Sequence, residues 1–418
     1  MQTKDCIIIS VCRLCDTKNI SKVINIGLTP LANSYSKKES SEKLKKYPLG
    51  LNLCASCGHL QLTHSIKPTK MFSNYLYKTN TSNKNYLHFK KYADELNKIF
   101  KKKNGKILDI ASNDGTFLSL FNKKKYFRLG IDPAKNLKKI AKKKGIIQID
   151  DFFTEKKSNI LKTKYQQFDI ITANHVCAHV ESLNDFFKGV KNLLKTDGIF
   201  VFEVSYRGSV LKNNTFDTIY HEHLDYHALF PLHRFLKKFG LKIFNFKITE
   251  AQGGSLRVYV SKNPKWINKK KISNQIIKEK KHYELFKYNT YQVFEKKINK
   301  CKIKLLKIFS LFEKKKLNMV GYGAAAKTTT FLSYFDLSKY KKIKYVFDDN
   351  NLKQGLYLPG TKIKILNPKL IRLKKIDIIV IFAWNYSDII IKKLRRDIKV
   401  NNKNIKFLIP FPNPKIIK

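Results

Sequence analysis

Short apolar runs alternate with amphipathic stretches from residue 106 onward, and this alternation restricts the fold more than any other feature of the chain. The runs are KILDI, FRLGID, IIQI, FDIITAN and GIFVFEV, separated by segments of helical character such as PAKNLKKIAKKKG. Buried strands that recur with helices between them form a doubly wound parallel sheet, whose ligand crevice lies at the carboxyl ends of the strands. The sequence therefore predicts an α/β domain with a binding site at that edge.

Acidic residues follow the first three of these strands. The first loop, DIASNDGTFL, lacks the Gly-x-Gly-x-x-Gly spacing of a dinucleotide site, and its Asp109 repels a pyrophosphate but suits a cationic or zwitterionic ligand. Asp132 ends the second strand, where a carboxylate accepts hydrogen bonds from a ribose diol. Asp150 or Asp151, with Phe152, follows the third strand and is placed to meet the edge and face of an adenine.

Any one of these acidic residues is ordinarily only a turn or a helix cap. Their occurrence in order, together with the polar segment NHVCAHV after the fourth strand, predicts a site for S-adenosylmethionine. We assign Asn113 and Gly115 of the first loop, and Asn174 at the end of the fourth strand, to the same cofactor site.

Four of the seven cysteines form two Cys-x-x-Cys pairs, CRLC and CASC. Each pair places two thiolates on a tight turn, and two such turns form the closed tetrahedral sulfur site that zinc prefers. The 38 residues between the pairs exceed the commoner spacing, so unmetallated core thiols or a redox pair are the alternative. The pairs predict a structural zinc ion with no open position for water, bound by Cys12, Cys15, Cys54 and Cys57.

The formal net charge of +53 is, by itself, typical of proteins that bind nucleic acid or an anionic membrane surface. The excess is nearly all lysine, whereas bidentate recognition of phosphates and bases favours arginine. We interpret the charge as mainly a solvated surface, and a zinc-containing methyltransferase that binds or modifies RNA remains the alternative. The chain shows no leader peptide and no apolar run of about 18 residues, so we expect a cytoplasmic protein without a membrane or obligate protein partner.

The segment DTIYHEHLDYH, residues 217–227, contains three of the ten histidines of the chain, together with tyrosines and carboxylates. A catalytic metal is one interpretation of this cluster. The His-Glu-x-x-His motif of zinc proteases places its histidines four positions apart on one helical face, whereas the histidines of HEH are two apart. The cluster therefore favours proton transfer over metal binding, with His221 as a structural histidine.

The chain resembles the nucleotide-sugar C-methyltransferases, which act on keto-deoxysugars for antibiotics and surface polysaccharides. The resemblance covers nearly the whole chain and rests on motifs that follow the first cysteine pair in a fixed order: PLANSY, SNDGTFL, ANHVCAHV, FDTIYHEH, GGSLRVYV, GYGAAAKTTTFL and DDNNLKQGLYLPG. It implies a zinc-binding domain at residues 1–78, a Rossmann-like class I methyltransferase core at 79–245 and a Rossmann-like α/β substrate-binding domain at 246–418. Ala111 stands where the family more often has glycine, and we expect cofactor binding to survive this change.

The resemblance also implies the chemistry. Methylation of carbon requires an enolate next to the sugar ketone, a base that removes the carbon-bound proton, and donors that hold the enolate oxygen. By resemblance His223 is the base, Glu222 orients it or contacts the sugar, and Tyr220 donates to the ketone or enolate oxygen. His179 lines the same site, and Tyr77, or alternatively Tyr75, reaches into it.

The last part of the chain contains a second strand, glycine turn and helix in LNMVGYGAAAKTTTFLSYF. A second dinucleotide cofactor would need a tighter fingerprint, so we expect this turn, with Lys327, to meet the diphosphate of the nucleotide sugar, and Gln252 to bind substrate. Residues 270–316 carry apolar groups at helical spacing, which predicts one long amphipathic helix or a broken pair.

An O- or N-methyltransferase acting on the same substrates is a further functional alternative.

Overall fold

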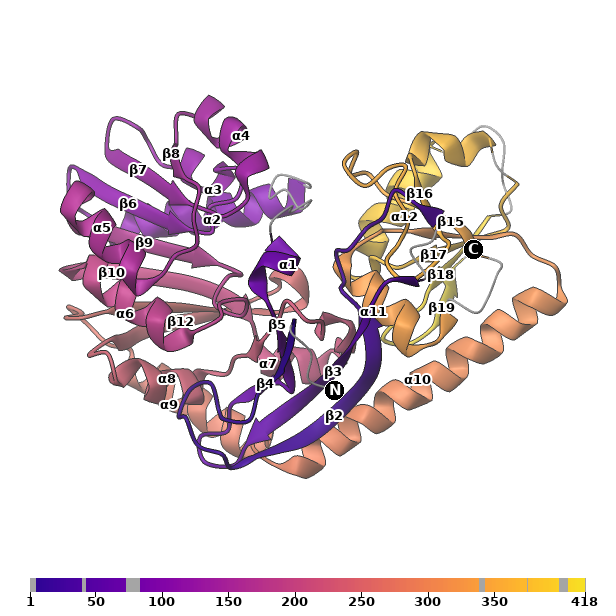
Figure 1. Cartoon of the computed structure of the whole chain (residues 1–418), viewed down its shortest axis with the longest axis horizontal. Coiled ribbons are helices and arrows are strands. Elements are labelled where there is room, and N and C mark those ends of the chain that lie inside the picture. Colours follow the sequence, from indigo (N-terminus) through magenta and orange to yellow (C-terminus); the bar gives the residue numbers. More distant parts are fainter. Residues whose placement is uncertain are drawn as a thin grey trace.

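The computed structural model describes residues 5–39, 43–72, 83–337, 343–373, 375–397 and 405–417. Within these residues the chain forms a seven-stranded, a six-stranded, a four-stranded and a two-stranded sheet. Figure 1 shows the seven-stranded and six-stranded sheets on opposite sides of the molecule, with the long N-terminal strands below and between them. No helix in these ranges is both long enough and apolar enough to cross a membrane.

The seven-stranded sheet contains the five strands that the sequence predicts. They run parallel in the order β8-β7-β6-β9-β10, so the order reverses between β6 and β9, as it does at the switch point of a doubly wound fold. An antiparallel edge, made by β13 and then β12, completes the sheet beyond β10. The strands are β6 (Gly105–Ile110), β7 (Tyr126–Ile131), β8 (Ile147–Ile149), β9 (Phe168–Asn174), β10 (Leu194–Ser205), β12 (Lys242–Thr249) and β13 (Ser255–Ser261). The sheet thus continues past residue 245, where we placed the domain boundary.

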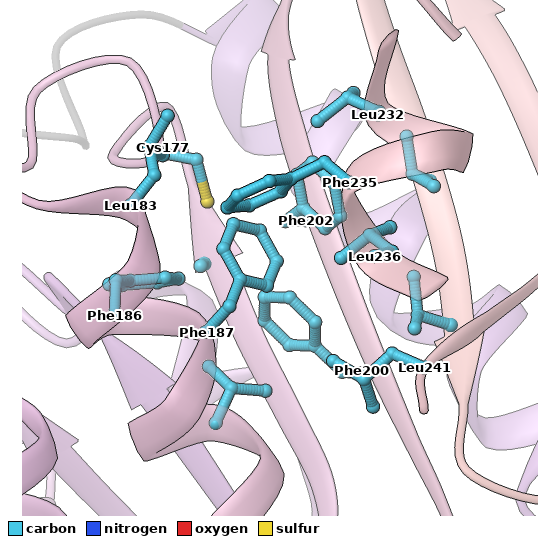
Figure 2. Packing of buried hydrophobic residues seen from close by; sticks show 14 of the residues in the cluster. Cys177, Leu183, Phe186, Phe187, Phe200, Phe202, Leu232, Phe235, Leu236 and Leu241 are labelled. Atoms are coloured by element: carbon cyan, nitrogen blue, oxygen red, sulfur yellow. The ribbon is translucent and has the colours of Figure 1, made fainter. Parts of the chain in front are cut away.

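Helix α6 (Leu183–Leu193) covers one face of this sheet because its apolar residues recur at helical spacing. Ser182 caps the helix by accepting a hydrogen bond from the backbone N–H of Asp185. Figure 2 shows the result: Phe187 packs against aromatic rings of β10 and of α8 (Leu229–Lys237). Its ring centroid lies 6.0 Å from that of Phe200 and 5.4 Å from that of Phe235.

Other helices around the sheet are α2 (Asn83–Ile99), α4 (Lys138–Lys143), α5 (Glu155–Tyr165) and α7 (Arg207–Lys212).

The four-stranded sheet belongs mainly to the N-terminal part of the chain, but one edge strand comes from elsewhere. Its order is β11-β4-β3-β2, and neighbouring strands are antiparallel. The N-terminal strands are β2 (Ile20–Pro30), β3 (Lys46–Cys54) and β4 (Leu60–Leu62). The edge strand from the middle of the chain is β11 (Asp225–Tyr226). The histidine-rich segment is therefore joined directly to the N-terminal sheet. A separate pair, β1 (Cys6–Ile8) with β5 (His64–Ile66), forms the two-stranded sheet.

The four paired cysteines converge beside this sheet. Their sulfur atoms lie within 4.8 Å of one another, with Cys12 Sγ 3.5 Å from Cys57 Sγ and Cys15 Sγ 3.6 Å from Cys54 Sγ. Zn–S bonds of about 2.3 Å in a tetrahedron place sulfurs about 3.8 Å apart, so the four thiols fit a zinc ion. Burial raises the pKa of the Cys15 thiol to about 11, so binding the metal releases protons.

The six-stranded sheet forms the C-terminal part. Its order is β16-β15-β14-β17-β18-β19, parallel except for the last strand. The strands are β14 (Met319–Tyr322), β15 (Ile343–Phe347), β16 (Lys364–Leu366), β17 (Ile378–Ile381), β18 (Lys406–Ile409) and β19 (Lys415–Ile417), flanked by α11 (Ala326–Tyr334) and α12 (Ser387–Asp397). Together with the first sheet and the cysteine cluster, this sheet confirms the predicted fold class.

The predicted amphipathic region is a broken pair of helices, α9 (Lys269–Ile277) and α10 (Tyr288–Lys314). The buried stripe of α10 belongs to one apolar cluster that also contains residues of β2, β3 and the C-terminal sheet. In Figure 1 this helix runs beneath the molecule toward the C-terminal sheet, alongside β2. It therefore packs against the N-terminal and C-terminal parts at once.

Replacing Phe187 by alanine should lower the free energy of unfolding by about 3 to 5 kcal/mol, because it removes a fully buried ring and leaves a cavity. Urea denaturation followed by circular dichroism measures the change. Ile160→Ala on α5 is the control, since that side chain is 52% exposed and should cost little. Equal effects of the two substitutions would contradict the packing described for α6.

Replacing Cys57 by serine should reduce bound zinc from about one ion per chain to a small fraction, because one of four thiolates is lost. Inductively coupled plasma mass spectrometry of protein purified without chelators measures the metal. Cys301→Ser is the control, since Cys301 is buried on α10 and is not among the four clustered thiols. Full zinc retention in Cys57→Ser would show that the cluster is not a metal site.

Candidate active site

The histidine-rich segment, residues 217–227, runs from the 3-10 turn Phe216–Thr218 through strand β11, and most of it is buried. Pairing of Asp225 and Tyr226 with β4 fixes its end against the N-terminal sheet. His221 is 1% exposed, and its Nε2 lies 3.2 Å from the carbonyl oxygen of Pro48 on β3. This environment fits the structural role that we expected for His221.

The hydrogen bonds of His223 determine which of its nitrogens is free to act as a base. Its Nδ1 lies 2.8 Å from the carbonyl oxygen of Thr218. Because a carbonyl only accepts, Nδ1 carries the proton and Nε2 presents a lone pair. The Tyr220 hydroxyl lies 2.8 Å from that Nε2 and donates to it. The imidazole of His223 is thus oriented by Thr218, and the lone pair of its Nε2 faces the phenol of Tyr220.

His179 stands next to His223, with ring centroids 4.8 Å apart in an edge-to-face arrangement. Burial, reinforced by the charge of His175, lowers the pKa of His179 to about 4. Burial, reinforced by His179, lowers the pKa of His223 well below the usual range. Both imidazoles are therefore neutral at pH 7, which is the state that a base requires.

Glu222 points away from the histidine pair toward the N-terminal part of the chain. Its Oε1 accepts a hydrogen bond of 2.6 Å from Asn33 Nδ2, whereas its buried Oε2 has no hydrogen-bond partner among the described residues. Burial raises the pKa of this carboxyl to about 7, although the positive charge of Lys353 opposes the shift. Since His223 is oriented by Thr218, Glu222 is placed for the second of its expected roles, contact with a ligand.

The C-terminal part closes the site through Trp384 and Lys327. The indole Nε1 of Trp384 donates a hydrogen bond of 2.6 Å to Asp217 Oδ2. Lys327, in the first turn of α11, lies 5.8 Å from the centroid of the same indole, and its Nζ is 3.4 Å from the carbonyl oxygen of Gln252. Burial lowers the pKa of Lys327, and Asp217 opposes this shift. A cavity of about 600 Å³ opens beside Trp384, and its lining includes Lys212, Lys297, Lys300 and Lys304.

The predicted cofactor loop is shaped by Asp132. One carboxylate oxygen accepts the backbone N–H of Asn113 and the other that of Ala134, both at 2.8 Å. Asp109 belongs to strand β6 rather than to the loop, and it accepts a hydrogen bond of 2.7 Å from the Thr172 hydroxyl. Burial raises the pKa of Asp109 to about 7. Both carboxylates thus stand near the carboxyl edge of the sheet, Asp132 after β7 as expected and Asp109 within β6 instead of in the loop.

The loop itself has an unusual backbone. Ala111, Asn113 and Gly115 have φ of +58°, +52° and +71°, all in the left-handed region. Glycine adopts this conformation without strain, whereas alanine pays a steric cost of about 1 kcal/mol or more. A Cβ at Gly115 would lie 3.2 Å from the side chain of Ala141, so this position has little room for any other residue. The loop keeps its turn at Ala111 despite the missing glycine.

The other predicted cofactor residues lie at the ends of neighbouring strands. Phe152 is 40% exposed, and the adjacent Asp151 forms an ion pair of 2.5 Å with Lys157. The side-chain oxygen and nitrogen of Asn174 are buried and have no hydrogen-bond partner among the described residues. A buried amide without partners is costly in a folded protein, so Asn174 is placed for a ligand that supplies both a donor and an acceptor.

A charge network at the end of β10 did not stand out in the sequence. Glu203 accepts hydrogen bonds from His88 Nε2 at 2.8 Å and Arg257 Nε at 2.9 Å, and His175 Nε2 lies 3.4 Å away. Although burial raises the pKa of Glu203, these partners hold it far below its usual range. Of this network, only Arg257 could have been found from the sequence, because it lies in the motif GGSLRVYV. No motif in the sequence contained His88 or Glu203.

Tyr77 and Tyr75, expected to reach into the site, lie outside the described residues. Several contacts were also missed. Asn33 and Lys353 lie inside the motifs PLANSY and DDNNLKQGLYLPG, so their presence was visible. The hydrogen bond from Asn33 to Glu222 and the electrostatic effect of Lys353 on that carboxyl were not. Nothing in the sequence pointed to Trp384.

Three family models match consecutive parts of the chain. The model described as "Putative zinc binding domain" matches residues 12–72, "Methyltransferase domain" matches 85–245 and "C-methyltransferase C-terminal domain" matches 250–412. The chain is also 27% identical over 411 residues to C-methyltransferase NovU of Streptomyces niveus, an alignment that covers 98% of this chain and 97% of that protein.

Two solved structures resemble part of the chain. An S-adenosylmethionine-dependent methyltransferase from Clostridium acetobutylicum is 18% identical, with 44% of this chain and 92% of that chain covered and a TM-score of 0.34. Magnesium protoporphyrin IX methyltransferase from Synechocystis is 12% identical, with 42% and 82% covered and a TM-score of 0.34.

The three domain models account for nearly the whole chain in the order zinc-binding, methyltransferase and C-methyltransferase C-terminal domain. The full-length relative is named for the same activity, and the cysteine cluster supplies the metal site. The chain is therefore an S-adenosylmethionine-dependent C-methyltransferase with an N-terminal zinc-binding domain, and its domain layout is similar to that of known C-methyltransferases.

Proposed function

We propose that the protein methylates a carbon next to the ketone of a nucleotide-linked keto-deoxysugar, for a surface polysaccharide or another glycoconjugate. The observation that carries this proposal is the arrangement around His223. A neutral imidazole, oriented by Thr218, faces a phenol that donates to its lone pair. Enolate formation needs both groups, a base for the carbon-bound proton and a donor for the oxygen.

The single lone pair of His223 Nε2 suggests the order of events. Without substrate, that lone pair accepts the Tyr220 hydroxyl. A ketone oxygen placed beside Tyr220 offers the hydroxyl a second acceptor, so the phenol turns to the ketone and frees Nε2. Nε2 then takes the proton from the adjacent carbon, and the electron pair of that C–H bond forms the enolate, whose oxygen Tyr220 holds.

Bound S-adenosylmethionine would supply an electrophilic methyl group to the enolate carbon, and its sulfur would keep the electron pair of the broken bond. His223 is left as an imidazolium, with the neutral ring of His179 beside it. Both rings lie in a largely buried site, which protects the enolate from reprotonation by water. The proton leaves His223 after methyl transfer.

Binding of the sugar nucleotide follows the remaining polar groups. Glu222 Oε2 is available to a sugar hydroxyl, and Asn33 fixes the carboxyl from the other side. Lys327 and the lysine-lined cavity beside Trp384 supply positive charge for the diphosphate. Gln252 positions Lys327 through its carbonyl oxygen. These contacts suit an anionic nucleotide joined to a neutral sugar.

The cofactor site is assigned to the edge formed by β6, β7, β8 and β9. Asp132 and Asp151 are placed for the ribose and the adenine edge, Phe152 for the adenine face and Asn174 for the amino acid part. Asp109, Asn113 and Gly115 shape the loop after the first strand. A cationic sulfonium centre suits the carboxylates of this edge.

Replacing His223 by alanine should slow exchange of solvent deuterium into the carbon next to the ketone by about 100-fold or more, because the general base is lost. A panel of nucleotide-linked 4-ketosugars is incubated in D₂O with protein, without and then with S-adenosylmethionine, and followed by mass spectrometry. Wild-type protein should add deuterium first and one methyl group once the cofactor is present.

The control for this test is His282→Ala, a histidine replacement at the exposed end of the segment Lys278–His282. It should exchange deuterium at the wild-type rate. Calorimetry should show unchanged S-adenosylmethionine affinity in both variants. Wild-type exchange by His223→Ala would reject the base assignment, and no exchange or methylation by the wild-type protein across the panel would reject the substrate class.

Replacing Phe152 by alanine should weaken S-adenosylmethionine binding about 10-fold, because stacking of an aromatic ring on a base contributes about 1 to 3 kcal/mol. Isothermal titration calorimetry measures the affinity. Ile160→Ala, which removes an exposed apolar side chain from the neighbouring helix α5, should bind as wild type. Equal affinity in Phe152→Ala would place the adenine elsewhere.

A further inference from the structure

Arg13 stands between two zinc-binding cysteines and reaches into the active-site region. Its Nε donates to both carboxylate oxygens of Asp225, at 2.9 and 3.1 Å. Its Nη2 donates to the carbonyl oxygen of Val180 at 2.6 Å, and its Nη1 to that of Glu181 at 3.0 Å. The planar fork of an arginine can satisfy such a set, whereas the ammonium group of lysine cannot.

These acceptors belong to the two segments that carry the candidate catalytic histidines. Val180 and Glu181 directly follow His179, and Asp225 is two residues beyond His223. The segments also meet through the backbone N–H of Leu224, which donates to the carbonyl oxygen of Ala178 at 2.7 Å. One guanidinium thus joins the two loops that bring the imidazoles to 4.8 Å.

A residue just after the second cysteine pair, Cys54 and Cys57, contacts the carboxylate of Asp225 as well. His59, two residues after Cys57, places its Nε2 2.8 Å from Asp225 Oδ1. The side chain of Asp225 is fully buried, and that of Arg13 is 11% exposed. Both halves of the cysteine cluster therefore converge on Asp225, where little water competes for the contacts.

We propose that Arg13 and Asp225 are positioning residues, which transmit the geometry of the zinc site to His179 and His223. A bound zinc ion fixes the backbone on both sides of Arg13, and the arginine fixes the two histidine segments. The metal thus lies outside the reaction but sets the distance between the groups that perform it. This proposal rests on the proposed role of His223 as the base.

The test compares Arg13→Gln with Arg234→Gln. Arg234 is a matched control, because it lies on α8 and donates to the carbonyl oxygen of Ser56 beside the same cysteine cluster, without contact to either histidine segment. Hydrogen-deuterium exchange of the full-length zinc-loaded protein is followed by peptide mass spectrometry. In Arg13→Gln, amides of residues 175–181 and 217–227 should exchange about 10-fold faster, with other peptides and zinc content unchanged.

Catalysis supplies the second measurement. Deuterium exchange into the ketosugar should have a kcat about 10-fold or more lower in Arg13→Gln, since a displacement of about 1 Å can cost that much. Affinity for S-adenosylmethionine should be unchanged. Arg13→Lys should recover part of the rate by keeping a donor to Asp225, and Arg234→Gln should match wild type in every measurement.

Asp225→Asn is the second variant, because it keeps the size and one acceptor of the side chain. It should loosen residues 217–227 and lower kcat while zinc is retained. The proposal is overturned if Arg13→Gln behaves as Arg234→Gln does, or if both Arg13→Gln and Asp225→Asn lose zinc or protection throughout the chain. The amide measurement needs no substrate, so it judges the positioning contacts even where wild-type protein fails to exchange the sugar and the proposed function is rejected.

Discussion

The pairing of β11 with β4 is the contact on which the site depends. It inserts two residues from the middle of the chain into the N-terminal sheet, more than 160 positions away in sequence. Such a short strand has little stability alone, and its end is fixed by the buried carboxylate of Asp225, which bonds with Arg13 and His59. This anchor fixes the carboxyl-terminal end of the histidine-rich segment against the N-terminal sheet.

The site keeps several polar atoms without partners in the described part of the chain. Glu222 Oε2, Asp217 Oδ1 and the amide of Asn174 are all buried in this state. Each such atom costs about 1 to 3 kcal/mol in the folded protein. A ligand that forms hydrogen bonds with these atoms recovers this free energy. The substrate-free protein is therefore less stable than it would be if these buried atoms had partners. The left-handed backbone at Ala111 adds to the same cost.

Most of the fold could be predicted because it depends on local patterns. The alternating strands and helices, the cysteine pairs and the amphipathic helical character of residues 270–316 each follow from spacing within a short window. The domain boundary that we placed at residue 245 falls within β12, because the apolar pattern of β12 and β13 does not say which sheet these strands join. Sheet membership is decided by long-range pairing, which no short window contains.

The site was predictable only in its types of residue. The segment YHEH predicted proton transfer. The sequence could not show that the carbonyl oxygen of Thr218 orients His223, because this contact depends on the backbone turn and not on a side chain. Glu222 was expected either to orient His223 or to contact the sugar, and the sequence could not show that its carboxyl accepts a hydrogen bond from Asn33, because that contact joins residues 189 positions apart. Nothing in the sequence singled out Arg13, because its contact with Asp225 joins residues 212 positions apart and leaves no local pattern.

The apolar cluster that α10 shares with β2, β3 and the C-terminal sheet has a consequence for synthesis of the protein. That cluster includes Val23 and Ile24 near the beginning of the chain and Phe411 close to its end. During translation the N-terminal strands leave the ribosome long before the residues that cover them. The apolar face of these strands is therefore not fully covered until nearly the whole chain has been synthesised. The core cluster of the seven-stranded sheet has its last buried residue at Leu285, so all of its residues are synthesised before the C-terminal sheet.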